Sequence, residues 1–277
     1  MQSREITLGH SPDPDDAFMF YALAADKIDT EGLRFRHVIE DIETLNRRAL
    51  NEELDVTAIS IHAYAHVLSR YALLTSGASV GDDYGHLIVS RKTISLGDLG
   101  KNRIAVPGTM TTAYLALRLC VGECDTVVIP FDKIMGAVEC GEVDAGLLIH
   151  EGQLTYAARG LNKVIDLGEW WKAETGLPLP LGGNAIRKSL GAELIAKVSG
   201  LLRESIEFGL AHREEAVLHS MAYGRGMQQD LTDRFVGMYV NAYTIDYGAR
   251  GRDAVRLLLD RAWRAALIPN SVELEFA

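Results

Sequence analysis

Cysteine is scarce in this chain of 277 residues, and its arrangement argues against a metal centre. The three cysteines are Cys120, Cys124 and Cys140, which is an odd number. Cys120 and Cys124 have helical spacing, but the second pair of ligands that a structural zinc site needs is missing. We therefore expect reduced structural thiols and no metal site.

Basic residues and long apolar runs are also few. The chain carries 28 Lys and Arg against 38 Asp and Glu, a net charge of −10. Because nucleic-acid binding depends on clustered basic side chains, we expect no nucleic-acid partner. No apolar run approaches the roughly 20 residues that span a bilayer, and the first residues lack the apolar core of a signal peptide. We therefore expect no membrane span and a cytoplasmic location.

Strand-like and helix-like segments alternate along most of the chain, which indicates an α/β fold. From residue 192 onward the pattern is helical almost to the end, and a Pro- and Gly-rich run over residues 178–183 marks the expected return to the first lobe. This order predicts a two-lobed periplasmic-binding-protein-like (type II) fold, with a mixed, mostly parallel sheet in each lobe, helices on both faces and a ligand cleft between the lobes. The first lobe is expected to comprise residues 1–95 and 188–277, and the second residues 96–187.

His150 is the predicted centre of the chemistry. It follows a short apolar run, residues 145–149, that is typical of a strand buried on both faces. Ligands of open α/β sheets bind beyond the carboxyl ends of strands, and imidazole titrates close to neutral pH. A histidine that only caps the strand is the alternative. His10 and His62 also follow predicted strands and are the next candidates for a base.

A weak internal echo points to a second part of the site. Residues 54–62 and 143–150 both read as an apolar-Asp pair, a buried strand and a polar residue at the following turn. The segment Ala58, Ile59 and Ser60 would then present its end to the same cleft as His150. Ser60 could equally be the N-cap of the next helix, and the two roles are compatible.

Two helix starts carry polar groups suited to a ligand. Thr111 and Thr112 follow Gly108 at a helix N-terminus, where hydroxyls and unpaired amides could hold the carboxylate of a small molecule despite the acidic surface. Threonine is also a common N-cap without any ligand. At the earlier start, Asp13 reads as a cap, and Asp16 is the best candidate for contacting ligand hydroxyls.

Five motifs in order resemble a known family. They read S-P-D-P-D-D-A-F-M-F-Y-A, E-D-I-E-T-L-N-R-R-A-L, A-V-P-G-T-M-T-T-A-Y, G-L-L-I-H-E-G-Q-L-T-Y and G-E-W-W-K-A-E-T-G-L-P-L-P-L-G, and they extend over about 180 residues. Together they resemble the 1,4-dihydroxy-6-naphthoate synthases of the futalosine route to menaquinone. One departure is visible, because the first loop reads S-P-D-P-D-D where the family pattern is S-P-C-P-N-D.

The resemblance implies a binding-protein-like fold used as a cytoplasmic enzyme. Such an enzyme converts cyclic dehypoxanthine futalosine to 1,4-dihydroxy-6-naphthoate and a triose-type fragment, dihydroxyacetone, by carbon–carbon cleavage without metal or organic cofactor. His150 corresponds to the catalytic base, and the segment ending at Ser60 together with Thr111 and Thr112 corresponds to substrate-contacting positions. The alternatives are a chorismate dehydratase-type sister enzyme of the same pathway and a non-catalytic solute-binding protein.

Overall fold

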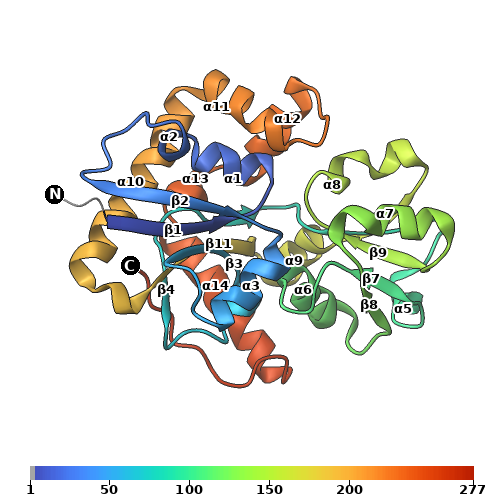
Figure 1. Ribbon diagram of the computed structural model, residues 1–277. Helices are drawn as coiled ribbons and strands as arrows, with labels where there is room; N and C mark the ends of the chain where they lie inside the picture. The colour runs from blue at the N-terminus through green and yellow to red at the C-terminus, as the bar shows by residue number, and fades with distance from the viewer. Residues whose placement is uncertain (1–3) are drawn as a thin grey trace.

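A mixed sheet forms the centre of the first lobe in the computed structural model, which describes residues 4–277 (Figure 1). In spatial order its strands are β2 (Leu33–Ile39), β1 (Arg4–His10), β3 (Val56–Ser60), β11 (Leu179–Arg187) and β4 (Tyr71–Leu73), with β5 (Ser79–Gly81) also paired to β11. Strand β1 is parallel to β2 and β3, whereas β11 is antiparallel to its three neighbours. Every residue of β3 is buried, as the sequence predicts.

Helices cover both faces of this sheet. Those of the first lobe are α1 (Pro14–Met19), α2 (Tyr21–Ala24), α3 (Ile42–Leu50), α4 (Ile61–Tyr64), α10 (Ala192–Ala211), α11 (Arg213–Ser220), α12 (Gln229–Tyr239), α13 (Ala242–Ile245) and α14 (Gly248–Arg264). One core packs Ile6 and Leu8 of β1 against Phe18 of α1 and Leu202 of α10. A second core joins β11 to α14 on the other side. The helices that follow β11 therefore pack against the sheet of the first lobe.

The second lobe is smaller and is also built on a mixed sheet. Its strands, in spatial order, are β10 (Asn162–Asp166), β6 (Leu87–Ser90), β9 (Ala145–Leu148), β7 (Ile104–Val106) and β8 (Thr126–Val128). Its helices are α5 (Leu96–Leu99), α6 (Thr112–Val121), α7 (Phe131–Cys140), α8 (Gly152–Thr155) and α9 (Leu167–Thr175). Short 3-10 turns cover Tyr156–Arg159, Lys188–Leu190 and Met221–Tyr223. The α/β class with mixed sheets and helices on both faces is confirmed. The expectation that each sheet is mostly parallel is wrong, because β11 in the first sheet and β6 in the second pair antiparallel with all of their neighbours.

Two strands belong to the lobe opposite to the one expected. Strand β6 was expected in the first lobe, but it pairs with β9 and β10 of the second sheet. Strand β11 was expected in the second lobe, but it lies between β3 and β4 of the first. The chain therefore crosses between β5 and β6 and returns between α9 and β11. Sequence periodicity identifies a buried strand but does not choose its antiparallel partners, which here lie far along the chain.

None of the helices formed within residues 4–277 has both the length and the apolar character needed to cross a membrane. This agrees with the sequence, in which no apolar run is long enough.

Candidate active site

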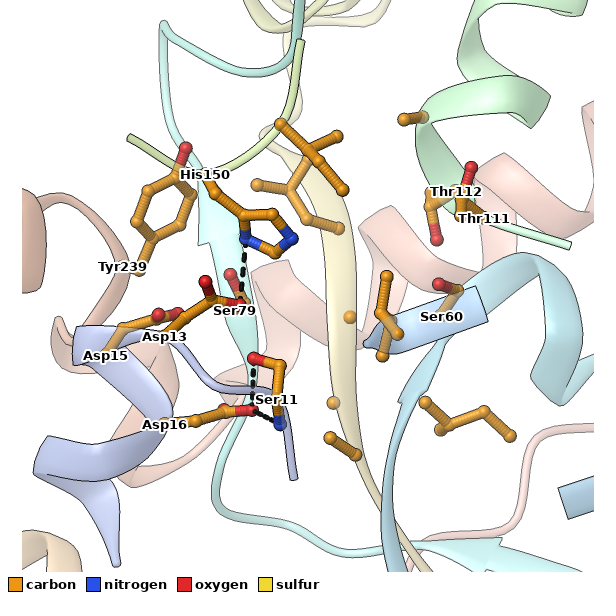
Figure 2. Close-up of a pocket in the computed structure, with 18 of the residues that line it drawn as sticks. Ser11, Asp13, Asp15, Asp16, Ser60, Ser79, Thr111, Thr112, His150 and Tyr239 are labelled. Atoms are coloured by element: carbon orange, nitrogen blue, oxygen red, sulfur yellow. Dashed lines mark hydrogen bonds and ion pairs between the residues drawn. The ribbon is translucent and has the colours of Figure 1, made fainter. Parts of the chain in front are cut away.

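A cavity of about 690 Å³, its opening included, lies between the lobes. Its wall includes His150 and all of the predicted substrate-binding residues: Asp16, Ala58, Ile59, Ser60, Thr111 and Thr112. Figure 2 shows His150 and the carboxylates on one side of the cavity, and Ser60 with the two threonines on the other.

His150 follows β9 and directs its imidazole into the cavity. Its backbone has φ of 60°, a left-handed conformation that is uncommon for residues other than glycine and is often found at functional sites. Nδ1 lies 3.0 Å from Oδ2 of Asp13, in an ion pair that crosses from one lobe to the other. Phe131 packs edge-on against the imidazole, with 4.6 Å between the two ring centroids. Nε2 is buried and has no partner among residues 4–277, so it is the nitrogen available to a ligand (Figure 2).

The ion pair sets the protonation of both partners. Burial, the largest influence, acts to lower the pKa of His150, but the charge and hydrogen bonding of Asp13 outweigh it, and the pKa is raised above its ordinary value. Burial likewise acts to raise the pKa of Asp13, but His150 and Arg225 lower it to about 2. Asp13 is therefore ionised at neutral pH, and His150 is a stronger base than a free imidazole.

Asp16 and Asp15, which follow in α1, have the opposite ionisation behaviour. Burial raises the pKa of Asp16 to about 6, although the amide and hydroxyl of Ser11 both donate to its Oδ2, at 2.6 and 2.8 Å. Burial and the neighbouring carboxylates Asp16 and Asp13 raise the pKa of Asp15 well above its usual range. Asp13 is therefore firmly ionised, whereas Asp15 and Asp16 hold a proton more readily than an ordinary carboxyl group.

Ser60 ends β3 on the far side of the cavity. Its hydroxyl and amide both bond to Asn46 of α3, whose Nδ2 donates to Ser60 Oγ at 3.0 Å and whose Oδ1 accepts from Ser60 N at 2.9 Å. The hydroxyl does not cap α4, which begins at the next residue. Asn46 also donates to the carbonyl of Met110 at 3.3 Å. Asn46 therefore fixes Ser60 in position and also contacts the second lobe.

Thr111 and Thr112 have different partners at the start of α6. The hydroxyl of Thr111 accepts from Tyr114 N at 3.1 Å and donates to the Gly108 carbonyl at 2.9 Å, so it is fully engaged as an N-cap. The hydroxyl of Thr112 accepts only a long bond from His62 N, at 3.4 Å. Of the two hydroxyls, that of Thr112 is therefore the one free to donate to a ligand.

Sequence reasoning missed several residues of the cavity wall. Asp13 was read only as a helix cap, yet its side chain makes no cap hydrogen bond and pairs with His150. Asn184 of β11 is 1% exposed, and its Oδ1 has no partner within the described chain. Tyr239 of α12 donates to Gln153 Oε1 at 2.7 Å. No local pattern marks Asn184 or Tyr239, because a strand and a helix distant in sequence bring them to the site.

The other candidate bases lie outside the cavity wall. His10 bonds through Nε2 to Nδ1 of His37 at 3.0 Å and through Nδ1 to the Ser11 carbonyl. The His62 ring stacks on Tyr114, with 6.4 Å between ring centroids. Burial lowers the pKa of each to about 4. Neither ring lines the cavity. His86 does line it, but burial lowers the pKa of His86 to about 3, so His150 is the best-placed base.

The fold and the site define a class: a two-lobed α/β protein of the periplasmic-binding-protein type, with a histidine and carboxylates facing the cavity between its lobes. The alkanesulfonate-binding protein of Xanthomonas axonopodis pv. citri shares this fold, with a TM-score of 0.73 over the full length of both chains at 12% identity. A crystal structure of a protein from Archaeoglobus fulgidus is more similar, with a TM-score of 0.93 and 49% identity over 97% of this chain and 100% of that one.

The chain belongs to the menaquinone biosynthesis family, whose model matches residues 6–264. A 1,4-dihydroxy-6-naphthoate synthase of Thermus thermophilus is 42% identical over 96% of this chain and 97% of its own length. Another, from Streptomyces coelicolor, is 37% identical over 97% of this chain and 96% of its own. The resemblance seen in the five motifs is thus confirmed over nearly the whole chain.

Proposed function

We propose that the chain is a 1,4-dihydroxy-6-naphthoate synthase of menaquinone biosynthesis. Family membership and the two synthases at 37–42% identity support this function. The structural observation that carries it is His150, whose Nε2 faces an enclosed cavity while its Nδ1 pairs with Asp13. A base held in this way can remove a proton from a bound hydroxyl without contribution from solvent.

The proposed reaction uses His150 as the base that cleaves a carbon–carbon bond. Nε2 takes the proton of a hydroxyl on cyclic dehypoxanthine futalosine, and the oxygen becomes a carbonyl as the adjacent carbon–carbon bond breaks. The electrons of that bond enter the ring, which becomes aromatic, and a triose-type fragment, dihydroxyacetone, leaves. Asp13 stabilises the imidazolium that forms. The enzyme would thus be a carbon–carbon lyase, with a cytoplasmic location as the sequence predicts.

The opposite wall would hold the substrate carboxylate. We assign this role to the Thr112 hydroxyl, the first amides of α6 and Ser60, with Thr111 as the cap that fixes the helix start. Asp16 would accept from hydroxyls of the sugar-derived ring. The chorismate dehydratase-type enzyme and the solute-binding protein are not favoured, because the relatives named above are synthases along nearly their full length.

The decisive experiment is incubation of the purified protein with cyclic dehypoxanthine futalosine, followed by chromatographic detection of 1,4-dihydroxy-6-naphthoate. His150→Gln should keep the shape of the site and lose proton transfer, so kcat should fall by about 10² to 10⁴ with little change in KM. His62→Gln is the matched control and should be much milder. Absence of naphthoate from the wild-type reaction would reject the function, and a fast His150→Gln enzyme would reject the base.

A further inference from the structure

Arg225 joins both lobes at the back of the catalytic histidine. It lies between the turn Met221–Tyr223 and α12, in the first lobe, and has φ of 47°. Its guanidinium donates to Asp13 Oδ1 through both terminal nitrogens, each at 3.1 Å, and to the Pro12 carbonyl at 3.1 Å. Across the cleft it donates to Glu151 Oε2 at 2.7 Å. Its carbon Cζ also lies 4.7 Å from the centre of the Phe131 ring.

These contacts include the two neighbours that hold the His150 ring. Asp13 pairs with His150 Nδ1, and Phe131 packs against the ring edge. Asp13 and Arg225 belong to the first lobe, whereas Phe131, His150 and Glu151 belong to the second. The pair between Asp13 and His150 can therefore form only when the lobes are together. Arg225 binds groups on both sides of the same junction.

The setting favours a substantial effect of this arginine. Its side chain is 28% exposed, that of Glu151 is 19% exposed and that of Asp13 is 1% exposed, so the contacts are better shielded from solvent than ordinary surface ion pairs. A planar guanidinium can also bind two carboxylates and an aromatic face at once, which an ammonium group cannot do equally well.

We propose that Arg225 is a positioning residue that couples lobe closure to the basicity of His150. It holds Asp13 and Glu151 across the junction, and closure delivers Asp13 to His150 Nδ1. For the reaction itself this role rests on the proposed synthase function. The effect on the imidazole does not, because it can be measured without substrate.

The sign of the change in the pKa of His150 distinguishes this role from a simple charge effect. If Arg225 keeps the lobes together, Arg225→Gln separates His150 from Asp13, and the histidine pKa falls toward about 6.5. If Arg225 acts only as a nearby positive charge, its removal raises the pKa. NMR titration of the His150 ring in the ligand-free protein gives the direction, and small-angle scattering should show a larger radius for Arg225→Gln. A raised or unchanged pKa would overturn the proposal.

The activity measurements use two further variants. In Arg225→Gln the KM should rise by roughly tenfold, because the closed state that binds substrate is less populated. The acid limb of kcat/KM should move to lower pH, because the pKa of His150 falls. Arg225→Lys should recover part of both changes. Arg203→Gln breaks an exposed pair with Glu207 on α10, away from the cleft, and should match the wild type. A pKa shift in a protein that makes no naphthoate would reject the proposed function and leave this coupling intact.

Discussion

The carboxylate of Asp13 raises the pKa of His150, the proposed base. It is almost fully buried, and within the described chain its charged partners are His150 and Arg225. A buried carboxylate that is kept ionised by two cationic partners is a strong local source of negative potential. His150 therefore retains basicity that burial alone would remove.

Asp13→Asn should remove this charge while keeping the side-chain shape. The pKa of His150 is raised in the native protein, so its neutral, basic form is lost as pH falls through a value above 6.5. Without the carboxylate only the weaker influences of Glu151 and Asp15 oppose the effect of burial, so that pKa should fall and the acid limb of kcat/KM should move to lower pH. We expect kcat to fall by less than the roughly 10² to 10⁴ expected for loss of the base itself. A limb at the wild-type pH would show that Asp13 does not tune His150.

At the scale of elements, we expect different roles for the two threonines at the start of α6: Thr111 caps the helix, and Thr112 binds the ligand. Thr111→Val removes an N-cap and should destabilise the protein by about 0.5 to 2 kcal/mol, with a modest effect on KM. Thr112→Val keeps the cap and should leave the melting temperature unchanged, but it should cost up to about 1.5 to 3 kcal/mol in kcat/KM if the hydroxyl binds a carboxylate. Chemical denaturation and steady-state kinetics on both variants test this. Equal KM values for Thr112→Val and the wild type would remove Thr112 from the substrate site.

Elements could be predicted from the sequence where the signal is local. His150 follows β9, Ser60 is the last residue of β3 and Thr111 has a capping position, so periodicity and start signals identified all three. Arg225 and Asn184 could not be found in this way, because tertiary packing alone brings Asn184 to the cavity and Arg225 to Asp13 and Glu151. The antiparallel partners of β6 and those of β11 could not be predicted for the same reason. These partners lie far along the chain, and hydrophobic periodicity carries no information about them.

Gly108, which precedes α6, is needed for close packing and not for an unusual backbone conformation. The residue does not have the positive φ that only glycine adopts readily. A Cβ at this position would overlap the carboxyl of Glu43 from α3. Glu43 Oε2 accepts from Met110 N at 3.0 Å, so the glycine allows the two lobes to approach each other.

At the scale of the whole molecule, several buried histidines set the response to acid. Burial lowers the pKa of His10, His37 and His62 to about 4 and that of His86 to about 3. All lie below the value of about 6.5 for an unfolded chain. Between those limits the unfolded chain binds more protons than the native protein, so stability is lost as pH falls.

Other groups in the site make smaller or opposite contributions. The raised pKa of Asp16, about 6, favours the native state as pH falls toward about 4, and the raised pKa values of Asp15, Glu43 and Asp166 act in the same direction. These four carboxyl groups are outnumbered by the histidines whose pKa is lowered, which also include His66 and His219. The contribution of Asp13 is lost only below about pH 4, as pH falls toward its native pKa of about 2. His150, whose pKa is raised, adds stability that is lost as pH rises through its native value. The net expectation is acid destabilisation beginning near pH 6.5.

The melting temperature should therefore fall steadily from about pH 6.5 to pH 4, because each such histidine contributes a slope of up to about 1.4 kcal/mol per pH unit. Calorimetry across this range measures the fall. His37→Gln removes one titrating ring and keeps a hydrogen-bonding group beside His10, so its melting temperature should depend less steeply on pH than that of the wild type. His212→Gln changes an exposed ring stacked on Phe208 and should keep the wild-type slope. A melting temperature that stays constant between pH 7 and pH 4.5 would mean that these histidines are not buried as neutral groups. Equal slopes for His37→Gln and the wild type would show that His37 does not contribute to the acid sensitivity.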